Sequence, residues 1–323
     1  MAVYLALLLA FCIRESVQQD PVKDFCRRFG HQSAIVDDRL YIDGGIINYA
    51  PLEENRHNYS YSYLSYHDLS KVTKDGMPPI NVDSLQKNDS VPDVHGGVLW
   101  PDPVNKRLYL FGGEFIADEP PISTSGIYAY DILNDQWDLM YDPANQPASG
   151  PVQRVSYGAG VAIPERGEGY YYGGWSSNTT HRDWGDKPPK ASSFLVKYVM
   201  DKNSWGNISG PDDVGRAEGA MVYVPAGDAG LLVYFGGVKD DGNGNSTAQP
   251  MDEILVYEVL SQKWYTQKAT GDVPGERERF CAGVATAPDS SSHNMYVPFQ
   301  CPCSLPQCYP SHAPIAALSV ISI

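Results

Sequence analysis

Leu108-Tyr109-Leu110-Phe111-Gly112-Gly113 is an apolar, β-prone run that ends in two glycines, and close variants of it recur along the chain. The variants are Tyr41-Ile42-Asp43-Gly44-Gly45, Tyr170-Tyr171-Tyr172-Gly173-Gly174 and Val233-Tyr234-Phe235-Gly236-Gly237. The first glycines of successive pairs are 68, 61 and 63 residues apart. A repeat of this length, made of short apolar runs between turn residues, predicts an all-β repeat fold.

Other residues follow the same period. An arginine precedes the glycine pair by 16 to 20 residues in three units, and a fourth arginine opens a fifth unit; these are Arg28, Arg154, Arg216 and Arg279. An aromatic run and then a tryptophan follow the pair, with the tryptophans at Trp137, Trp205 and Trp264. The pair Gly96-Gly97 lies off this spacing and has no aromatic run before it, so we leave it out of the repeat.

One architecture explains these features together. Four-stranded sheets arranged radially crowd their innermost strands around an axis, which favours small residues there. A glycine pair at the end of the second strand permits positive φ and a close approach to the next sheet. The late Tyr and Trp fill the wider outer gap between sheets, and a buried arginine has five donors to bind loop carbonyls.

The repeat resembles the kelch repeat, one blade of a β-propeller, over about residues 25 to 297. The resemblance implies an all-β, kelch-type propeller with four full blades and a truncated partial fifth. It is greatest to secreted or cell-surface kelch proteins of fungi. Units one and two depart from the pattern, with Leu69-Ser70 in place of a tryptophan and Pro92 in place of the arginine.

The N-terminus and the glycosylation acceptors indicate the secretory pathway. Val3 to Ile13 are uncharged and apolar, too short to span a bilayer and typical of a signal peptide, which we assign to residues 1–16. Residues 22–297 then form the repeats and 298–323 an atypical tail. Acceptor sequences for N-glycans stand at Asn58, Asn88, Asn178, Asn207 and Asn245. We therefore expect a secreted, extracellular or cell-wall glycoprotein without a transmembrane segment apart from the signal-like start.

The tail breaks the repeat. Where a fifth glycine pair is expected, the sequence has Phe299-Gln300, followed by three cysteines and by prolines at 302, 306, 310 and 314. Proline supplies no donor to a β-ladder. Our hypothesis is that the reading frame departs from the ancestral one near Val297 and that further blades were lost. The alternative is a genuine divergent tail that packs across the open side of the propeller.

Composition and motifs limit the kinds of ligand and reaction that we expect for this protein. The formal charge of −15 argues against a nucleic-acid partner. The seven histidines show no metal-ligand spacing, and the matching positions of His31 and His95 favour a packing role. We predict no cofactor, no bound metal and no catalytic residue. Cys26 and Cys281 fall within the repeats and form a bridge only if the fold brings their strands together.

Three functions remain open. The expected one is a non-catalytic extracellular propeller that binds a protein or glycan ligand. The alternative is a galactose-oxidase-like or other carbohydrate-active enzyme that uses the propeller axis, although the copper ligand that galactose oxidase takes from a further domain has no counterpart here. An intracellular kelch adaptor needs a partner domain and conflicts with the signal. A propeller fold by itself selects none of these functions.

Overall fold

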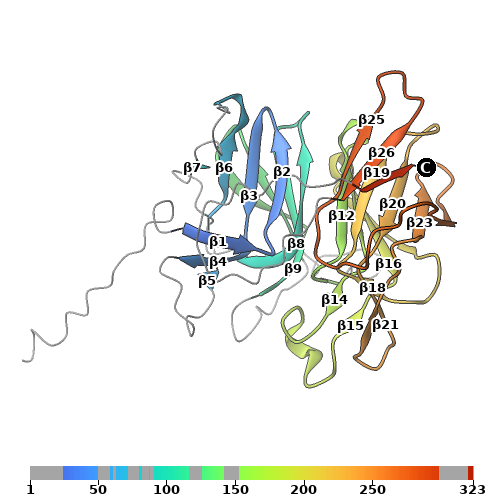
Figure 1. The fold of residues 1–323 in the computed structure, drawn as a ribbon. Coiled ribbons are helices and arrows are strands. Elements are labelled where there is room, and N and C mark those ends of the chain that lie inside the picture. The colour runs from blue at the N-terminus through green and yellow to red at the C-terminus, as the bar shows by residue number, and fades with distance from the viewer. Residues whose placement is uncertain are drawn as a thin grey trace, which may run out of the picture.

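The computed structural model of the protein describes residues 25–49, 59–60, 63–71, 80–81, 87, 91–115, 126–141, 153–297 and 319–322 (Figure 1). The proposed signal peptide, Asn58, Asn88 and most of the tail lie outside these residues. The described chain is almost entirely β-structure. Its helical segments are four short 3-10 turns: η1 (Leu69–Lys71), η3 (Pro164–Arg166), η4 (Arg182–Trp184) and η5 (Met200–Lys202). Among the described residues, no helix is long and apolar enough to cross a membrane.

Four antiparallel sheets of four strands each form consecutive blades, in which spatial order follows chain order. Blade 1 consists of β2 (Gln32–Val36), β3 (Arg39–Asp43), β6 (Ser65–Asp68) and β7 (Ile80–Asn81). Blade 2 consists of β8 (Val94–Asp102), β9 (Arg107–Phe115), β10 (Ile127–Asp131) and β11 (Gln136–Tyr141). Blade 3 consists of β12 (Ala159–Ile163), β13 (Glu168–Tyr172), β16 (Phe194–Val199) and β17 (Ser204–Ser209). Blade 4 consists of β19 (Ala220–Val224), β20 (Leu231–Phe235), β23 (Glu253–Glu258) and β24 (Lys263–Lys268).

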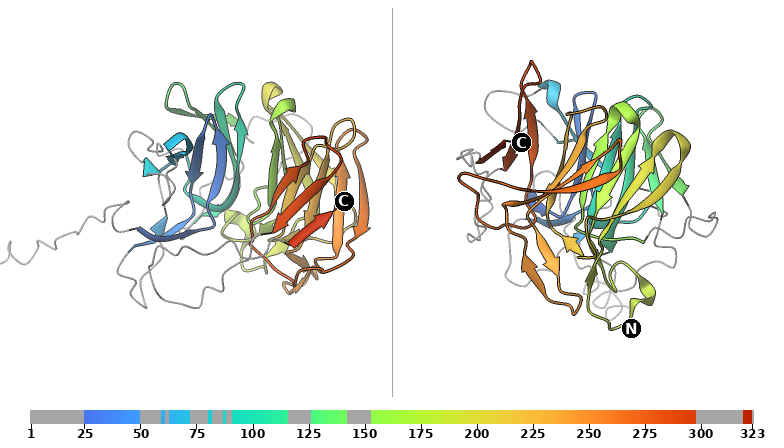
Figure 2. Two further views of the ribbon diagram at one scale, coloured as in Figure 1. Left: turned by 45° about the horizontal axis from the view of Figure 1, so that its top comes forward. Right: turned by 90° about the vertical axis from the view of Figure 1, so that its right-hand side faces the viewer.

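A fifth sheet of three strands follows, made of β25 (Gly283–Thr286), β26 (His293–Val297) and β27 (Ser319–Ser322). The last strand belongs to the tail, and it pairs antiparallel with β26. The first strands of the five sheets lie side by side in chain order, β2 beside β8, then β12, β19 and β25 (Figure 2). These strands therefore line the propeller axis.

Three small sheets extend the blades at one end of the propeller, seen at the bottom of Figure 1. They are β1 (Phe25–Phe29) with β4 (Ile46–Tyr49) and β5 (Tyr59–Ser60); β14 (Trp175–Ser176) with β15 (Lys190–Ala191); and β18 (Arg216–Ala217) with β21 (Val238–Asp240) and β22 (Ser246–Ala248). In each of them, one strand comes directly after a glycine pair. The glycine pair is thus the point at which the chain leaves the blade and enters the end layer.

The glycine pairs also join neighbouring blades. The second glycine of each pair donates its N–H to a carbonyl of the next unit, at 2.8–2.9 Å: Gly45 to Val94, Gly113 to Val155, Gly174 to Arg216 and Gly237 to Arg277. Gly173 has φ +69°, and a Cβ placed on it would lie 2.1 Å from the Arg216 carbonyl oxygen. The approach of two backbones therefore requires glycine here.

The expectation that Gly44, Gly112, Gly173 and Gly236 end the second strands is correct in three blades. Strands β3, β13 and β20 stop immediately before their glycine pairs. In blade 2 the expectation is wrong, because β9 continues through Gly112-Gly113 to Phe115. The reason is that β8 starts early and supplies a partner for this extension, with Val94 opposite Phe115 and Gly97 opposite Gly112.

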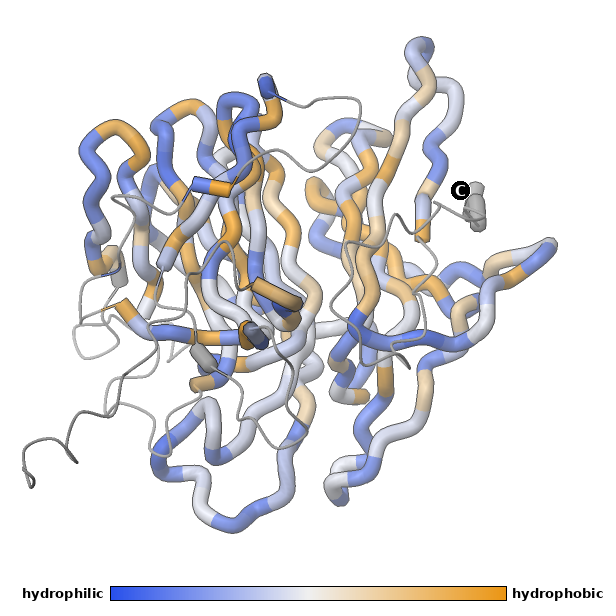
Figure 3. Tube along the Cα trace, turned by 60° about the vertical axis from the view of Figure 1, so that its left-hand side comes forward, coloured by the Kyte–Doolittle hydropathy of each residue, from blue (hydrophilic) through white to orange (hydrophobic). Residues whose placement is uncertain are grey.

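Aromatic side chains fill the gaps between blades. The ring of Trp205 lies 5.4 Å from that of Tyr198 in its own blade and 5.6 Å from that of Phe111 in blade 2. The ring of Trp264 lies 5.1 Å from Tyr257 in its own blade and 5.0 Å from Tyr172 in blade 3. Apolar stretches run along the strands in Figure 3, as a core made of inter-blade contacts requires.

The structure decides whether Cys26 and Cys281 form a disulfide bridge. Cys26 is disulfide-bonded, whereas Cys281 is free and exposed. The pairing of Cys26 with Cys281 is therefore wrong, and the partner of Cys26 lies outside the described residues. Within the described part of the chain, no group of three or more His, Cys, Asp or Glu side chains is placed to hold a metal ion.

Candidate functional site

A chain of backbone hydrogen bonds runs across the five sheets at the start of their innermost strands. Each residue donates its N–H to the carbonyl of its counterpart in the preceding unit: Gly96 to Gly30 at 2.7 Å, Tyr157 to Gly96 at 2.6 Å, Glu218 to Tyr157 at 2.6 Å and Arg279 to Glu218 at 2.8 Å. All five residues have positive φ, between 52° and 70°. We call Gly30, Gly96, Tyr157, Glu218 and Arg279 the inner ring.

The inner ring corrects the repeat alignment at one position. The bonds place Arg279 opposite Glu218, two residues beyond the counterpart of Arg216. The counterpart of Arg216 in the fifth unit is Arg277, whose carbonyl accepts from Gly237 as the Arg216 carbonyl accepts from Gly174. Gly96-Gly97 lies in the first strand β8, so leaving this pair out of the glycine pairs of the second strands is correct; Gly96 belongs to the inner ring instead. Counted along the inner ring, the units are 66, 61, 61 and 61 residues long.

The other three repeat arginines, Arg28, Arg154 and Arg216, lie between the blades and the end layer. Arg28 Nε donates to the Gly44 carbonyl at 2.7 Å, and Arg154 Nη1 donates to the carbonyls of Gly112 and Gly113. Burial lowers the pKa of Arg154 to about 10. Arg216 is 1% exposed and forms a bidentate pair with Asp212, while its Nε donates to Gln249 at 2.9 Å. These three arginines act within the scaffold and not in an open site.

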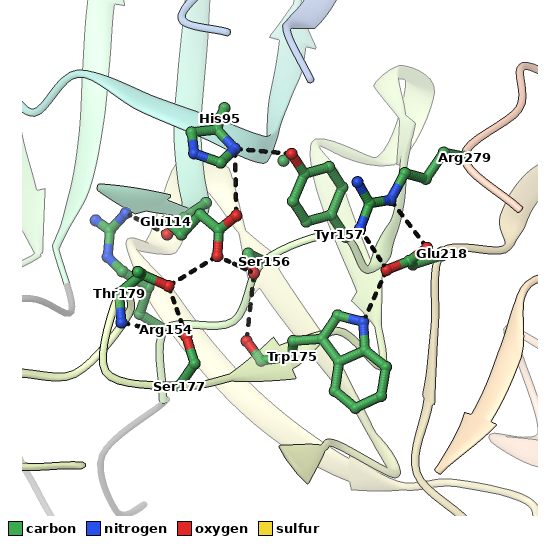
Figure 4. A network of polar contacts seen from close by, with 12 residues as sticks. His95, Glu114, Arg154, Ser156, Tyr157, Trp175, Ser177, Thr179, Glu218 and Arg279 are labelled. Atoms are coloured by element: carbon green, nitrogen blue, oxygen red, sulfur yellow. Dashed lines mark hydrogen bonds and ion pairs between the residues drawn. The ribbon is translucent and has the colours of Figure 1, made fainter. Parts of the chain in front are cut away.

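Three side chains of the inner ring line one small pocket, the axial pocket, of about 290 Å³. Its polar and aromatic lining includes Glu114, Tyr157, Trp175, Ser177, Glu218 and Arg279, which come from four successive units (Figure 4). Glu114 and Trp175 each follow a glycine pair directly. The pocket therefore lies between the inner ring and the end layer.

Glu218 holds one side of the axial pocket. Its carboxylate is 8% exposed and accepts from Arg279 through Nε at 2.9 Å and Nη2 at 2.7 Å. Trp175 Nε1 donates to the same carboxylate at 3.1 Å. The hydrogen bond from Arg279 to Glu218 raises the arginine pKa, and the guanidinium also lies over the Tyr157 ring, 4.3 Å from its centre. The ion pair of Arg279 and Glu218 leaves little net charge on this side of the axial pocket.

Glu114 and His95 hold the opposite side. Glu114 Oε2 accepts from Thr179 Oγ1 at 2.8 Å and lies 3.4 Å from Ser156 Oγ. His95 Nδ1 is 3.3 Å from Glu114 Oε1 and 2.7 Å from the Tyr157 hydroxyl. Burial lowers the pKa of His95 and raises that of Tyr157 to about 12, so both side chains are neutral at pH 7.

A larger hollow of about 530 Å³ lies on the other side of β14 and β15, against Trp184, Phe194 and Asp240. Two of its three aspartates already accept from the backbone: Asp240 accepts from the N–H of Ala191 at 2.7 Å and of Gly242 at 2.9 Å, and Asp241 accepts from the N–H of Asn243 at 2.7 Å. The axial pocket is smaller, but its carboxylates, guanidinium and two aromatic rings converge from separate blades. We therefore take the axial pocket as the candidate site.

The sequence-predicted residues lie mostly elsewhere. The tryptophans Trp137, Trp205 and Trp264 lie on the fourth strands of blades 2 to 4. Of the described glycan acceptors, Asn178 lies in the turn after β14, Asn207 on β17 and Asn245 between β21 and β22, and all three are exposed. Among the candidate residues that the structure describes, only Arg279 reaches the axial pocket. Tyr157, Trp175 and Glu218 were missed. Trp175 directly follows a repeat glycine pair, whereas Tyr157 and Glu218 lie three and two residues after repeat arginines.

Comparisons with known proteins support the fold. No family model matches the chain. A kelch repeat-containing protein of Arthroderma benhamiae is 30% identical over 311 aligned residues, which cover 85% of this chain. The chain spans about 44% of that relative's length. The kelch propeller YjhT matches with a TM-score of 0.54 and 16% identity, covering 85% of this chain and 74% of that one.

Proposed function

Because the chain is a kelch-repeat protein whose repeats fold as β-propeller blades, we propose that it binds a neutral carbohydrate in the axial pocket, as an extracellular and non-catalytic module. The observation that carries the proposal is the convergence of Tyr157, Trp175, Glu218 and Arg279 on one pocket of about 290 Å³. A volume of this size accepts a single sugar ring.

The chemistry of the lining favours a sugar over an anionic ligand. A pyranose presents C–H groups on its faces and hydroxyls around its edge. Tyr157 and Trp175 offer aromatic surface on which the C–H groups pack. The carboxylates and the guanidinium are planar hydrogen-bond partners for the hydroxyls. Since Arg279 is already paired with Glu218, an anion would have to displace a bidentate ion pair. A neutral glycan can bind without breaking this ion pair.

Three features support the extracellular placement. The N-terminal segment has the pattern of a signal peptide, and three exposed residues are acceptors for N-glycans. Cys26 is disulfide-bonded, which is typical of an oxidising compartment. Expression in a eukaryotic secretory host, followed by glycosidase digestion, should give a visible drop in mass.

The binding test uses a glycan array, followed by calorimetry with the sugars that bind. We expect Trp175→Ala to weaken binding at least tenfold, because it removes the aromatic surface and the indole donor to Glu218. Trp184→Ala is the matched control, since Trp184 lies in the larger hollow outside the axial pocket. Equal loss in both variants, or unchanged binding in Trp175→Ala, would contradict the proposal.

A second candidate is a carbohydrate-active enzyme that uses the same pocket. It is favoured by two carboxyl groups, Glu114 and Glu218, that line one small cavity, as acid and base pairs do in glycoside hydrolysis. Turnover of a bound sugar that is lost in Glu218→Gln would support this alternative. Stoichiometric copper in the purified protein would instead support the galactose-oxidase-like version.

A further inference from the structure

A hollow of about 330 Å³ opens at the rim of the propeller over blade 3. Its lining residues are Gln153, Val155, Ser192, Phe194, Val196 and Asn207. Gln153 and Val155 belong to the segment that enters blade 3, and the others lie on or just before β16 and β17. The hollow combines an apolar floor with a glycan acceptor, Asn207-Ile208-Ser209, at its edge.

Strand register sets the relation between the acceptor and the floor. Val196 stands directly opposite Asn207, and Phe194 stands opposite Ser209. Asn207 and Phe194 are therefore diagonal neighbours on one face of the sheet, a separation that long side chains bridge. The same face continues to Tyr198 and Trp205, which fill the gap toward blade 2. The hollow is the part of this gap that no large side chain of the described residues fills.

Phe194 is an unusual residue for this position. It is 50% exposed, although its neighbour Val196 on the same face is only 6% exposed. An exposed aromatic ring beside a glycan acceptor provides a face on which the C–H groups of a sugar pack, with the gain that accompanies burial of apolar surface. Asn207 itself is exposed on the outermost strand of its blade and is thus accessible to modification.

We propose that Asn207 carries an N-linked glycan whose first sugar residues pack on Phe194 in this hollow and stabilise blade 3. The donor is an oligosaccharide linked to a lipid through pyrophosphate. The side-chain amide nitrogen of Asn207 loses a proton and bonds to C1 of the first sugar, while the C1–O bond breaks and the lipid pyrophosphate leaves. The proposal rests on the extracellular placement above and is independent of ligand binding in the axial pocket.

Asn245 provides a contrast within the same chain. It lies in an exposed turn, where its side-chain amide donates to Asp241 at 3.1 Å and its backbone N–H donates to the same residue at 3.2 Å. A glycan on Asn245 would extend from a loop rather than over a strand face. Removal of this acceptor is therefore the matched control for removal of Asn207.

The experiment uses the full chain secreted from a eukaryotic host. Peptide mass spectrometry should show Asn207 occupied. Ser209→Ala, which removes the acceptor sequence and keeps Asn207, should lower the melting temperature by roughly 1–2 °C, the change expected for loss of about 1 kcal/mol in a chain of this size. The control Thr247→Ala, which removes the acceptor sequence and keeps Asn245 and its hydrogen bonds to Asp241, should leave it unchanged. Trimming the glycan to its first sugar should retain most of the stability.

A double-mutant cycle tests the contact with Phe194. In the Phe194→Ala background, loss of the Asn207 glycan should change the melting temperature much less than in the wild type. An unoccupied Asn207 would overturn the proposal, as would an occupied Asn207 whose removal has no more effect than Thr247→Ala. Sugar binding to the axial pocket, measured on the same samples, reports separately on the proposed function.

Discussion

Glu218 illustrates how much of the candidate site depends on single side chains. Its backbone N–H donates to the inner ring, and its carboxylate accepts from Trp175 and from both donating nitrogens of Arg279. The residue therefore links blades 3, 4 and 5 through contacts that no local sequence pattern specifies. His95 has a similar role on the other side, where it lies beside Glu114 and Tyr157.

His95 should make the stability of the protein depend on pH. Burial lowers the pKa of His95 below its ordinary value of 6.5, Glu114 opposes the shift and Arg279 adds to it. Below pH 6.5 the unfolded chain therefore takes up a proton that the folded chain resists, and the free energy of unfolding falls as the pH drops. In urea titrations at pH 7.5 and 5.5, His95→Gln should lose less stability than the wild type. Identical losses would show that His95 does not contribute.

At the scale of elements, the glycine pair is the joint between a blade, its end layer and the next blade. Strands β13 and β20 stop at the pair, and the second glycine then bonds to the following unit. The pair in blade 2 shows that the bond matters more than the strand end, because β9 passes through Gly112-Gly113 and Gly113 still donates to Val155.

Gly173→Ala should be far more destabilising than an ordinary glycine substitution. Its φ is +69°, and its Cβ would meet the backbone oxygen of Arg216 at 2.1 Å, which cannot move without separating two blades. The control is Gly167→Ala: φ is +59° there and the nearest atom to the new Cβ is 3.8 Å away. We expect a loss of about 1–2 kcal/mol for Gly167→Ala and roughly 3 kcal/mol or more for Gly173→Ala in urea unfolding. Equal losses would show that the approach of the blades is not the constraint.

At the scale of the whole molecule, the inner ring has two ends that do not bond to each other, and among the described residues no further backbone hydrogen bond joins them. The four bonds start at the Gly30 carbonyl and finish at the Arg279 N–H, so they link the five sheets in sequence without closing a circle. The fifth sheet includes β27 from the tail, paired with β26. The hypothesis of a shifted reading frame near Val297 stays a prediction, and sequencing of the mature transcript would test it.

The two described cysteines should differ sharply in reactivity. Cys281 is free and exposed and should be labelled by a thiol reagent in the native protein, whereas Cys26 should be labelled only after reduction. Reduction should also lower the melting temperature, because the disulfide of Cys26 restricts the unfolded chain. Peptide mapping of the labelled protein gives the answer, and labelling of Cys26 without reductant would contradict the assignment. The variant Cys281→Ser should melt as the wild type does.

The fold could be predicted from the sequence because the sequence repeats. Every blade packs against its neighbours in the same way, so the same residue types recur at the same places in each unit. These are the glycine pairs, the small residues before them and the late aromatic residues, and Gly173 or Trp205 therefore has counterparts in other units. The axial pocket has no such signal. Gly30, Gly96, Tyr157, Glu218 and Arg279 occupy equivalent places, yet they share backbone geometry and no side-chain chemistry. Only the bonds between blades reveal their equivalence, because a residue's place around the axis depends on contacts with units about 61 residues away.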